Sequence, residues 1–383
     1  MPPLAPQILT TPHSGIRRMV ELAGSVPDPL MLVSGDPNFA TPRHIVAAAA
    51  AAGYAGNTGY APAAGIASLR SAIVDKVRRV NGLDVDVDQV CVTTGGCGAL
   101  YTTMLVLLEP GDEILIPDPG WSNYPAMAHS LRARAVGYRL ARPSFEIDPE
   151  AIERAITPRT RAILVNSPSN PTGSVEAPER LRAVIDIAER HDLWVISDEC
   201  YDQLVFEARH VSMATLGAPE RVITVFTFSK SYAMTGWRVG YVVAPKEFIR
   251  QLALHQEPVV SCASSVSQHG ALAALEGPQD GVGEMVAAYR RRRDAVIEEL
   301  DARNVGFVRP MGGFFVMADV TAAGMESWEA STELLREEHV AVVPGLAFGQ
   351  GGEGFVRLSL AASDEVVSEG ARRLARFVDR HRR

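Results

Sequence analysis

The sequence of 383 residues contains little cysteine, with thiols only at Cys91, Cys97, Cys200 and Cys262. No two of them have the Cys-x-x-Cys spacing found in redox and zinc motifs, and four are too few for a disulfide framework in a chain this long. We therefore expect a protein of a reducing compartment, the cytoplasm. No zinc-type cluster of cysteine and histidine is present, so we expect no metal site.

Long apolar runs and an excess of basic residues are also missing. The most apolar stretch, residues 99–108, includes two threonines and is too short to cross a bilayer. The first residues lack the basic segment and apolar core of a secretory signal. A net charge of −8 argues against nucleic-acid binding, whereas 47% hydrophobic residues suffice for a large core. We expect no membrane partner and no nucleic-acid partner.

Common hydrolase and nucleotide-binding signatures are absent: the chain has no HExxH, no Walker P-loop and no GxSxG. Instead, short apolar runs alternate with amphipathic stretches from residue 89 onward. The runs predict strands at 90–92, 114–116, 162–165, 194–196, 222–226 and 241–243, with helices at 99–108, 122–131, 149–156 and 178–190. This alternation predicts an α/β fold with a mostly parallel sheet covered on both faces by helices.

The sequence changes character near residue 280. A long charged helix is predicted at 284–300, followed by short strands at 307–308, 312–317, 340–343 and 355–360 and a last helix at 365–380. These elements predict a smaller α+β domain. We expect a large domain of residues 46–280 and a small domain made of residues 1–45 and 281–383.

One lysine lies between two apolar runs, within residues 227–238. Lys230 follows a predicted buried strand, and crowding there would lower its pKa and favour Schiff-base chemistry. Arg238 and the hydroxyls of Thr227 and Ser229 suit the oxygens of a phosphate. A Schiff-base lysine beside a phosphate site indicates pyridoxal phosphate (PLP). The alternative is a surface lysine and a structural arginine between two strands.

Two loops after other predicted strands offer contacts for the same ligand. Gly95, Gly96 and Cys97 open a helix, where free N–H groups and the helix dipole attract a phosphate. A dinucleotide fingerprint fails here because its third glycine would fall at Tyr101. Trp121 follows the next strand and could stack on a flat ring. A plain strand–helix turn and a core tryptophan are the respective alternatives.

Polar residues that end buried strands need partners. Asp198 could meet a pyridinium nitrogen, with Tyr201 donating to the ring's phenolate oxygen, or it could cap a helix. Asn170, in a loop rich in proline, could donate to a ligand oxygen or serve turn formation only. Arg357, in an apolar strand, needs a carboxylate from an internal acid or from a substrate.

The order of these motifs resembles one family. The match comprises Gly35-Asp36-Pro37, Tyr60, Gly95-Gly96, Trp121, Asn170-Pro171, Asp198 with Tyr201, Ser229-Lys230 with Arg238, and Arg357, and runs from about residue 30 to the C-terminus. Together they resemble the class I/II aminotransferases, the fold type I PLP enzymes of the aspartate aminotransferase superfamily. The resemblance implies that Lys230 binds PLP as a Schiff base. The reaction implied is a ping-pong transfer of an amino group between an L-amino acid and a 2-oxo acid.

The resemblance also implies a role for each matched residue. Asp198 would hold the pyridine nitrogen and Trp121 would stack on the ring. Asn170 and Tyr201 would contact the phenolate oxygen. The phosphate would be bound by Gly95, Gly96, Cys97, Thr227, Ser229 and Arg238, and by Tyr60 of a neighbouring subunit, which implies a homodimer with shared active sites. The substrate carboxylate would bind Arg357 and the main chain at Gly35, beside Trp121 and Asn170.

Two other functions share parts of this pattern. A PLP-dependent C–S lyase, a decarboxylase or another elimination enzyme would use the same residues. A PLP-sensing transcriptional regulator would carry an additional N-terminal DNA-binding segment, for which a pattern that begins at Gly35 leaves no room. Cys97 occupies a position where some aspartate-specific bacterial relatives carry a lysine. We therefore do not expect an enzyme restricted to dicarboxylates, and the substrate stays open.

Overall fold

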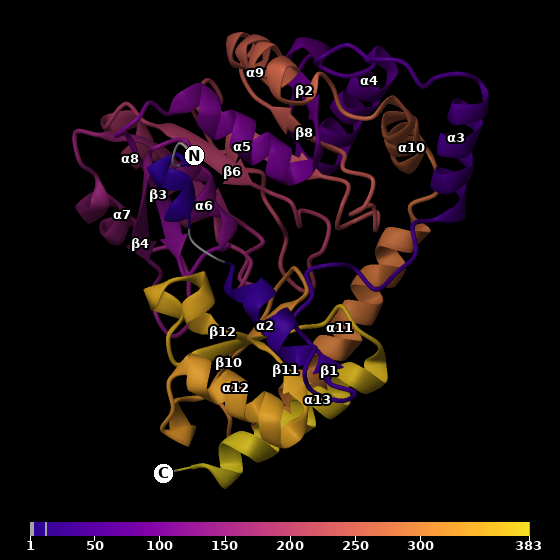
Figure 1. Ribbon diagram of the computed structural model, residues 1–383. Coiled ribbons are helices and arrows are strands. Elements are labelled where there is room, and N and C mark those ends of the chain that lie inside the picture. The colour runs from indigo at the N-terminus through magenta and orange to yellow at the C-terminus, as the bar shows by residue number, and fades with distance from the viewer. Residues whose placement is uncertain (1–3, 12–13, 383) are drawn as a thin grey trace.

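The computed structural model describes residues 4–11 and 14–382, and its centre is a seven-stranded sheet in the order β2-β8-β7-β6-β5-β3-β4 (Figure 1). The strands are β2 (Val90–Thr93), β3 (Glu113–Asp118), β4 (Arg134–Arg139), β5 (Thr160–Asn166), β6 (Trp194–Asp198), β7 (Val222–Thr227) and β8 (Gly240–Val243). Neighbouring strands are parallel except where β8 pairs with β2 and with β7. The predicted α/β fold with a mostly parallel sheet is confirmed.

Helices cover both faces of this sheet, as Figure 1 shows. They are α4 (Ala67–Lys76, continued by a π-helical turn, Val77–Asn81), α5 (Gly95–Leu107), α6 (Asn123–Ser130), α7 (Pro149–Ala155), α8 (Pro178–Arg190) and α9 (Lys246–Val260). Outside them, α10 (Ser265–Glu276) packs on α4, and α3 (Arg43–Tyr54) packs on α10. Alternate residues of one strand face opposite layers. Ile114 and Ile116 pack with α5, α6 and α9, whereas Leu115 packs with α8.

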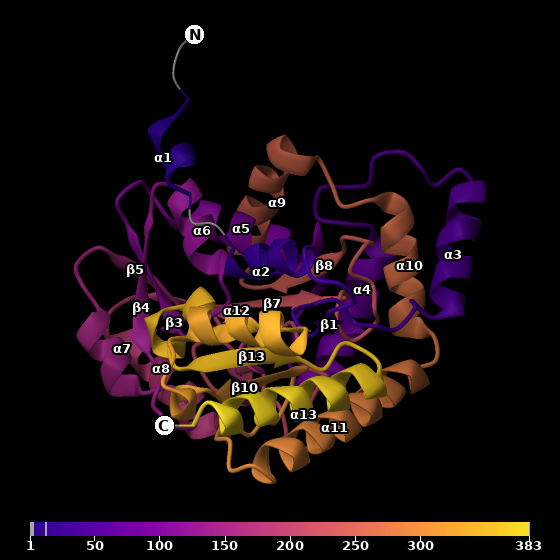
Figure 2. The same cartoon turned by 60° about the horizontal axis from the view of Figure 1, so that its bottom comes forward.

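A second group of elements lies below the large sheet in Figure 1, coloured orange and yellow. It contains the antiparallel sheet β12-β13-β10-β9. Its members are α11 (Asp280–Asp301), β9 (Phe307–Val308), β10 (Phe315–Asp319), α12 (Ser327–Glu338), β11 (Val340–Ala341), β12 (Val343–Pro344), β13 (Phe355–Ser359) and α13 (Asp364–Arg380). In Figure 2, α11 and α13 lie side by side under this sheet.

The start of the chain packs against this C-terminal group. Helix α1 (Pro6–Leu9) precedes α2 (Gly15–Ala23), which contacts β11 and β12. Strand β1 (Leu30–Met31) pairs in parallel with β11, and the next residue, Leu32, accepts a backbone hydrogen bond from Ser359 of β13 at 2.8 Å. The first residues after β1 are therefore held beside the C-terminal end of β13.

Polar strand ends of the large sheet meet at one edge. Asn166 pairs with Asp198 in register, and Gly240 pairs with both Thr93 and Thr227. Ligands of open α/β sheets bind at this carboxyl edge. None of the helices in the described ranges has the length and apolar character needed to cross a membrane.

Candidate active site

A cavity of about 340 Å³ opens at this edge of the sheet, a volume suited to a small organic ligand. Most residues predicted from the sequence line it: Gly35, Gly96, Cys97, Trp121, Asn170, Asp198, Tyr201, Thr227, Ser229, Lys230, Arg238 and Arg357. Gly95 adjoins the cavity beside Arg238. Tyr60 does not line it: the tyrosine is 90% exposed on the loop between α3 and α4.

Lys230 follows β7 and projects into the cavity. Its Nζ donates a hydrogen bond to the main-chain oxygen of Gly35 at 2.7 Å. Burial lowers the pKa of Lys230, against the smaller raising effects of Cys200, Cys97 and Asp36. A lowered pKa increases the fraction of neutral amine, which is the nucleophilic and basic form.

Arg357 is 1% exposed in β13, with its guanidinium 4.1 Å from the centre of the Phe315 ring. Its Nη1 donates to Asn170 Oδ1 at 2.9 Å and its Nη2 to the Val33 oxygen at 2.7 Å. Its buried Nε has no partner, and no acid of the described chain pairs with it. Burial lowers the pKa of Arg357 to about 9, which leaves it charged at neutral pH. The internal acid considered from the sequence is not found.

Asp198 ends β6 and is 4% exposed. Its Oδ2 accepts from the Tyr124 hydroxyl at 2.6 Å, and its Oδ1 accepts from the backbone N–H of Cys200 at 3.2 Å. Burial raises the pKa of Asp198, against the lowering effect of these hydrogen bonds. The chain continues from Asp198 as a turn, so the alternative role as a helix cap is wrong. A cation placed against this carboxylate would favour its ionised form.

The start of α5 forms an anion-binding corner. Gly95 has φ +75°, and the Arg238 guanidinium lies 2.8 Å from where a Cβ at Gly95 would be, so the close approach requires glycine. Nη1 of Arg238 is held by the Thr235 oxygen at 2.7 Å. On the adjoining strand end, the Thr227 hydroxyl donates to Ser229 Oγ at 2.9 Å. A helix N-terminus, a guanidinium and two hydroxyls are suited to a phosphate.

Aromatic and amide groups complete the walls. Trp121 makes an edge-to-face contact with Tyr124, with ring centres 5.3 Å apart. Tyr201 is 5% exposed, and Nζ of Lys230 lies 6.0 Å from the centre of its ring. Burial raises the pKa of Tyr201, and Asn170 and Arg357 partly oppose that rise. The phenol therefore stays protonated and can donate a hydrogen bond.

Comparison with known proteins agrees with this geometry. A sequence profile described as "Aminotransferase class I and II" matches residues 27–374. The chain is 41% identical to the aspartate/prephenate aminotransferase of Thermus thermophilus, over 95% of this chain and 94% of that protein. It is also 41% identical to an arginine–pyruvate transaminase of Pseudomonas aeruginosa, over 90% and 89%. The aspartate aminotransferase of Rhizobium meliloti superposes with a TM-score of 0.94 at 35% identity, covering 99% of this chain and 100% of that one.

The chain belongs to the class I and II aminotransferases. Its fold is the fold type I of this family, and the family resemblance inferred from the sequence motifs is confirmed. It is a PLP-dependent aminotransferase, and its substrates are an amino acid and a 2-oxo acid. The lyase and regulator alternatives are not supported by these relatives.

The residues present in this aminotransferase fit PLP. The anion corner at Gly95 and Arg238 matches the phosphate, and Asp198 lacks a cation partner among the described residues, as expected where a protonated ring nitrogen binds. Lys230 lies in the same cavity with a lowered pKa. The donor set therefore contains a group for each charged or reactive part of the cofactor.

Some lining residues were not predicted from the sequence: Ile16, Ser34, Asp36, Leu100, Tyr124, Asn166, Cys200 and Thr235. Tyr124 is fully buried in α6, and a tyrosine in an amphipathic helix is indistinguishable in sequence from a core residue. Ile16 comes from α2, which no local pattern connects with strands more than a hundred residues away. Asn166 ends β5 next to Asp198, and its position at a strand end was a usable signal.

Proposed function

We propose that Lys230, Asp198 and Arg357 divide the work of transamination in this pocket. Lys230 is the amine that binds the cofactor and moves the proton at the substrate α-carbon. Asp198 holds the ring nitrogen in its protonated form. Arg357 binds the substrate α-carboxylate. The observation that supports this assignment most directly is the buried Arg357 guanidinium, which faces the cavity without an acid partner in the described chain.

The main-chain oxygens that accept hydrogen bonds from Lys230 and Arg357 indicate that both side chains can act on one substrate molecule. Nζ of Lys230 bonds the Gly35 oxygen, and Nη2 of Arg357 bonds the Val33 oxygen. Because two residues of chain span at most about 7 Å, these two oxygens lie close together. One α-amino acid can therefore present its carboxylate to Arg357 and its α-carbon to Lys230. The main chain at Gly35 would contact the same carboxylate.

The remaining contacts follow from the shape of the cavity. When bound, PLP supplies an aldehyde that links covalently to an amine and a protonated ring that accepts electrons from the α-carbon. Gly95, Gly96, the main chain of Cys97, Thr227, Ser229 and Arg238 would bind its phosphate. Tyr201 and Asn170 would donate to the ring oxygen. Trp121 would cover one ring face and exclude water from the reacting atoms.

We propose that the amino-acid substrates are not restricted to dicarboxylates. The basic residues that line the described cavity are Lys230, Arg238 and Arg357, and each already has a role. Cys97 contributes no cation, and Ile16 and Leu100 add apolar surface. Relatives named for aspartate, prephenate and arginine are about equally similar to this chain, which fits a site that is not built for an acidic side chain alone.

We also propose a cytoplasmic homodimer in which Tyr60 reaches the phosphate of the partner's site. Tyr60 is 90% exposed, although it lies in the family motif. All four cysteines are free thiols, which fits a reducing compartment. The division into residues 46–280 and a small domain of 1–45 and 281–383 is supported by the pairing of β1 with β11. The small domain would close over the substrate.

Two measurements test the assignment. Borohydride reduction of the PLP-loaded protein should fix the cofactor on Lys230, and the chain offers only two other lysines, Lys76 and Lys246. Label on either of those would contradict the proposal. Incubation with an amino acid alone should give one half-reaction, and a 2-oxo acid should restore continuous turnover. Continuous release of ammonia without a 2-oxo acid would instead indicate a lyase.

A further inference from the structure

Buried charged side chains lie on the side of the 198–202 turn that faces away from the cavity. Asp198, Cys200 and Tyr201 line the cavity, whereas Glu199 and Asp202 do not. Both of these acids are buried, with 1% and 8% exposure. The turn thus has one face that belongs to the active site and another that belongs to a separate polar network.

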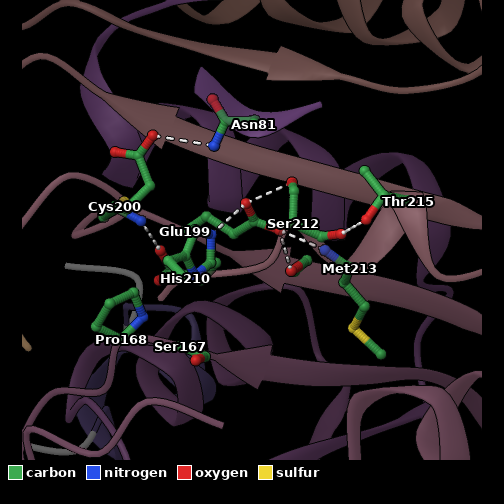
Figure 3. Close-up of polar contacts among 12 residues, drawn as sticks. Asn81, Ser167, Pro168, Glu199, Cys200, His210, Ser212, Met213 and Thr215 are labelled. Atoms are coloured by element: carbon green, nitrogen blue, oxygen red, sulfur yellow. Dashed lines mark hydrogen bonds and ion pairs between the residues drawn. The ribbon is translucent and has the colours of Figure 1, made fainter. Parts of the chain in front are cut away.

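Glu199 makes the first half of this network. Figure 3 shows it between His210 and Ser212, with Met213 close by. Its Oε2 accepts from Ser212 Oγ at 2.6 Å and from His210 Nε2 at 2.8 Å, and its Oε1 accepts from the Met213 N–H at 3.0 Å. A further bond at 2.8 Å comes from Ser197 Oγ. The carboxylate ties the turn to residues 210–213.

Asp202 makes the second half. Its Oδ2 accepts from Lys76 Nζ at 2.5 Å and from Asn81 Nδ2 at 3.1 Å. Lys76 ends α4, is 3% exposed, and lies 4.6 Å from the centre of the Phe226 ring. Asn81 belongs to the π-helical turn that continues α4 and accepts a bond from Lys76 at 2.8 Å. This ion pair ties the far end of the turn to α4.

The two halves are coupled through His210, which bonds Glu199 and also lies in the field of Asp202. Burial opposes protonation of His210, but Glu199 and Asp202 outweigh it and raise its pKa. Lys76 supplies the cation that faces Asp202, and His210 Nε2 bonds Glu199. Burying such charges gains little stability compared with apolar side chains of equal size. Such a hydrogen-bonded network fixes the geometry of its members, whereas an apolar cluster does not.

We propose that Glu199 and Asp202, held by His210 and Lys76, are positioning residues that fix the turn so that Asp198 and Tyr201 meet the cofactor. Anchors on both sides of Tyr201 restrict the turn from two directions. Small displacements of groups that bind reacting atoms are costly in rate and affinity. This inference rests on the proposed roles of Asp198 and Tyr201.

The test compares Glu199→Gln and Asp202→Asn with the wild-type protein. Each change keeps the shape of the side chain and removes its charge. PLP is titrated into the cofactor-free protein, and its dissociation constant is measured from the visible absorption band. The pH at which that band changes is measured on the loaded protein. We expect each variant to bind PLP about tenfold more weakly and to shift this pH.

Glu113→Gln is the matched control. Glu113 is also 1% exposed and hydrogen-bonded, to Thr157 at 2.5 Å and Arg159 at 3.2 Å, but it lies at the opposite edge of the same sheet. It should lower the melting temperature and leave PLP binding and the visible band unchanged. Variants of Glu199 and Asp202 that behave in the same way would overturn the proposal.

A third variant tests the same proposal if Glu199→Gln and Asp202→Asn fail to fold. His210→Gln retains a donor near the former Nε2 and removes the titratable ring, so we expect the same pH shift with a smaller loss of affinity. An unchanged band and unchanged affinity in a folded His210→Gln protein would refute the inference. A wild-type protein that does not bind PLP would instead refute the proposed function.

Discussion

The Tyr124 hydroxyl lies 2.6 Å from Oδ2 of Asp198, and both side chains are buried. This hydrogen bond fixes the carboxylate from α6 while the turn after β6 fixes it from the other side. Removal of a hydrogen bond to a charged group costs about 1.5–3 kcal/mol. We expect Tyr124→Phe to weaken PLP binding by about 10- to 100-fold, measured by titration of the cofactor-free protein.

Tyr138→Phe is the control for that experiment. Tyr138 is 1% exposed and donates to the main-chain oxygen of Leu164 at 2.9 Å, and it does not line the cavity. The Tyr138→Phe variant should be less stable than wild type and should bind PLP with unchanged affinity. Equal PLP binding by Tyr124→Phe and wild type would show that the bond to Asp198 is irrelevant to the cofactor.

Replacing Lys230 should remove most turnover. Lys230→Ala deletes the amine that we assign to proton transfer, and acid–base catalysis by one group contributes about 10²–10⁴-fold. Steady-state rates with an amino acid and a 2-oxo acid measure the loss. Lys246→Ala, which removes an exposed ion pair with Asp86, should keep wild-type rates. A Lys230→Ala enzyme with near-normal turnover would contradict the assignment.

Arg357→Lys tests the carboxylate site. A lysine cannot reproduce the forked contact of a guanidinium, so we expect kcat/KM for L-amino acids to fall by about 10²-fold or more, mainly through KM. Each amino acid can be compared with the amine that lacks its carboxylate. The variant should lose the preference for the amino acid, because that preference depends on Arg357. If the variant still preferred the amino acid over the amine, the substrate carboxylate would bind at a residue other than Arg357.

The proposed sharing of active sites predicts complementation between two inactive variants. In a hybrid of Lys230→Ala and Tyr60→Ala subunits, one site has both defects and the other has neither. Activity should therefore return when the two proteins are unfolded, mixed and refolded together. Tyr54→Ala, at a residue that is 95% exposed on α3, should be fully active by itself. If mixing restores nothing, Tyr60 does not act across subunits.

The raised pKa of Glu176 predicts that the free energy of unfolding depends on pH. Burial raises the pKa of this carboxyl to about 7, despite a hydrogen bond from the Ile147 N–H. Between the ordinary value of 4.5 and about 7 the folded state binds more protons than the unfolded state, so stability falls as pH rises. Glu176→Gln should therefore stabilise the protein at pH 8, by as much as about 3 kcal/mol, and change little near pH 4.

Denaturant unfolding at both pH values measures this effect. Glu207→Gln should show the opposite sign, because the hydrogen bond from Arg293 lowers the pKa of Glu207 to about 2. That stability is present above the ordinary pKa of a glutamate and is lost as pH falls toward 2. A Glu176→Gln protein that is less stable than wild type at pH 8 would contradict a raised pKa for the buried Glu176 carboxyl.

Strands with apolar residues on both faces were predictable from sequence, because a buried parallel strand needs a continuous apolar run. β4 was missed: it is an edge strand, and Arg134 and Arg139 at its ends are exposed. α9, α10 and α12 were also not predicted. α10 is built largely from small residues, and its burial against α3 gives no strong apolar period in the sequence.

The site was predictable where a motif follows a strand. Lys230, Asp198 and Asn170 each come after an apolar run, so their place at the carboxyl edge followed from the fold. The absence of an acid partner for Arg357 could not be predicted, since it depends on which side chains the small sheet brings near. Tyr124 and the network of Glu199 and Asp202 depend on contacts between distant segments, which sequence spacing does not encode.

The backbone of residues 33–35 accepts a hydrogen bond from Arg357 at the Val33 oxygen and one from Lys230 at the Gly35 oxygen. We therefore expect the opening segment of the chain to contribute to substrate binding, although it supplies no titrating side chain to either contact. A truncated version that starts after residue 36 would release the guanidinium and the amine together. Protein engineers who trim or swap this segment should expect damage to substrate handling even where the rest of the chain folds.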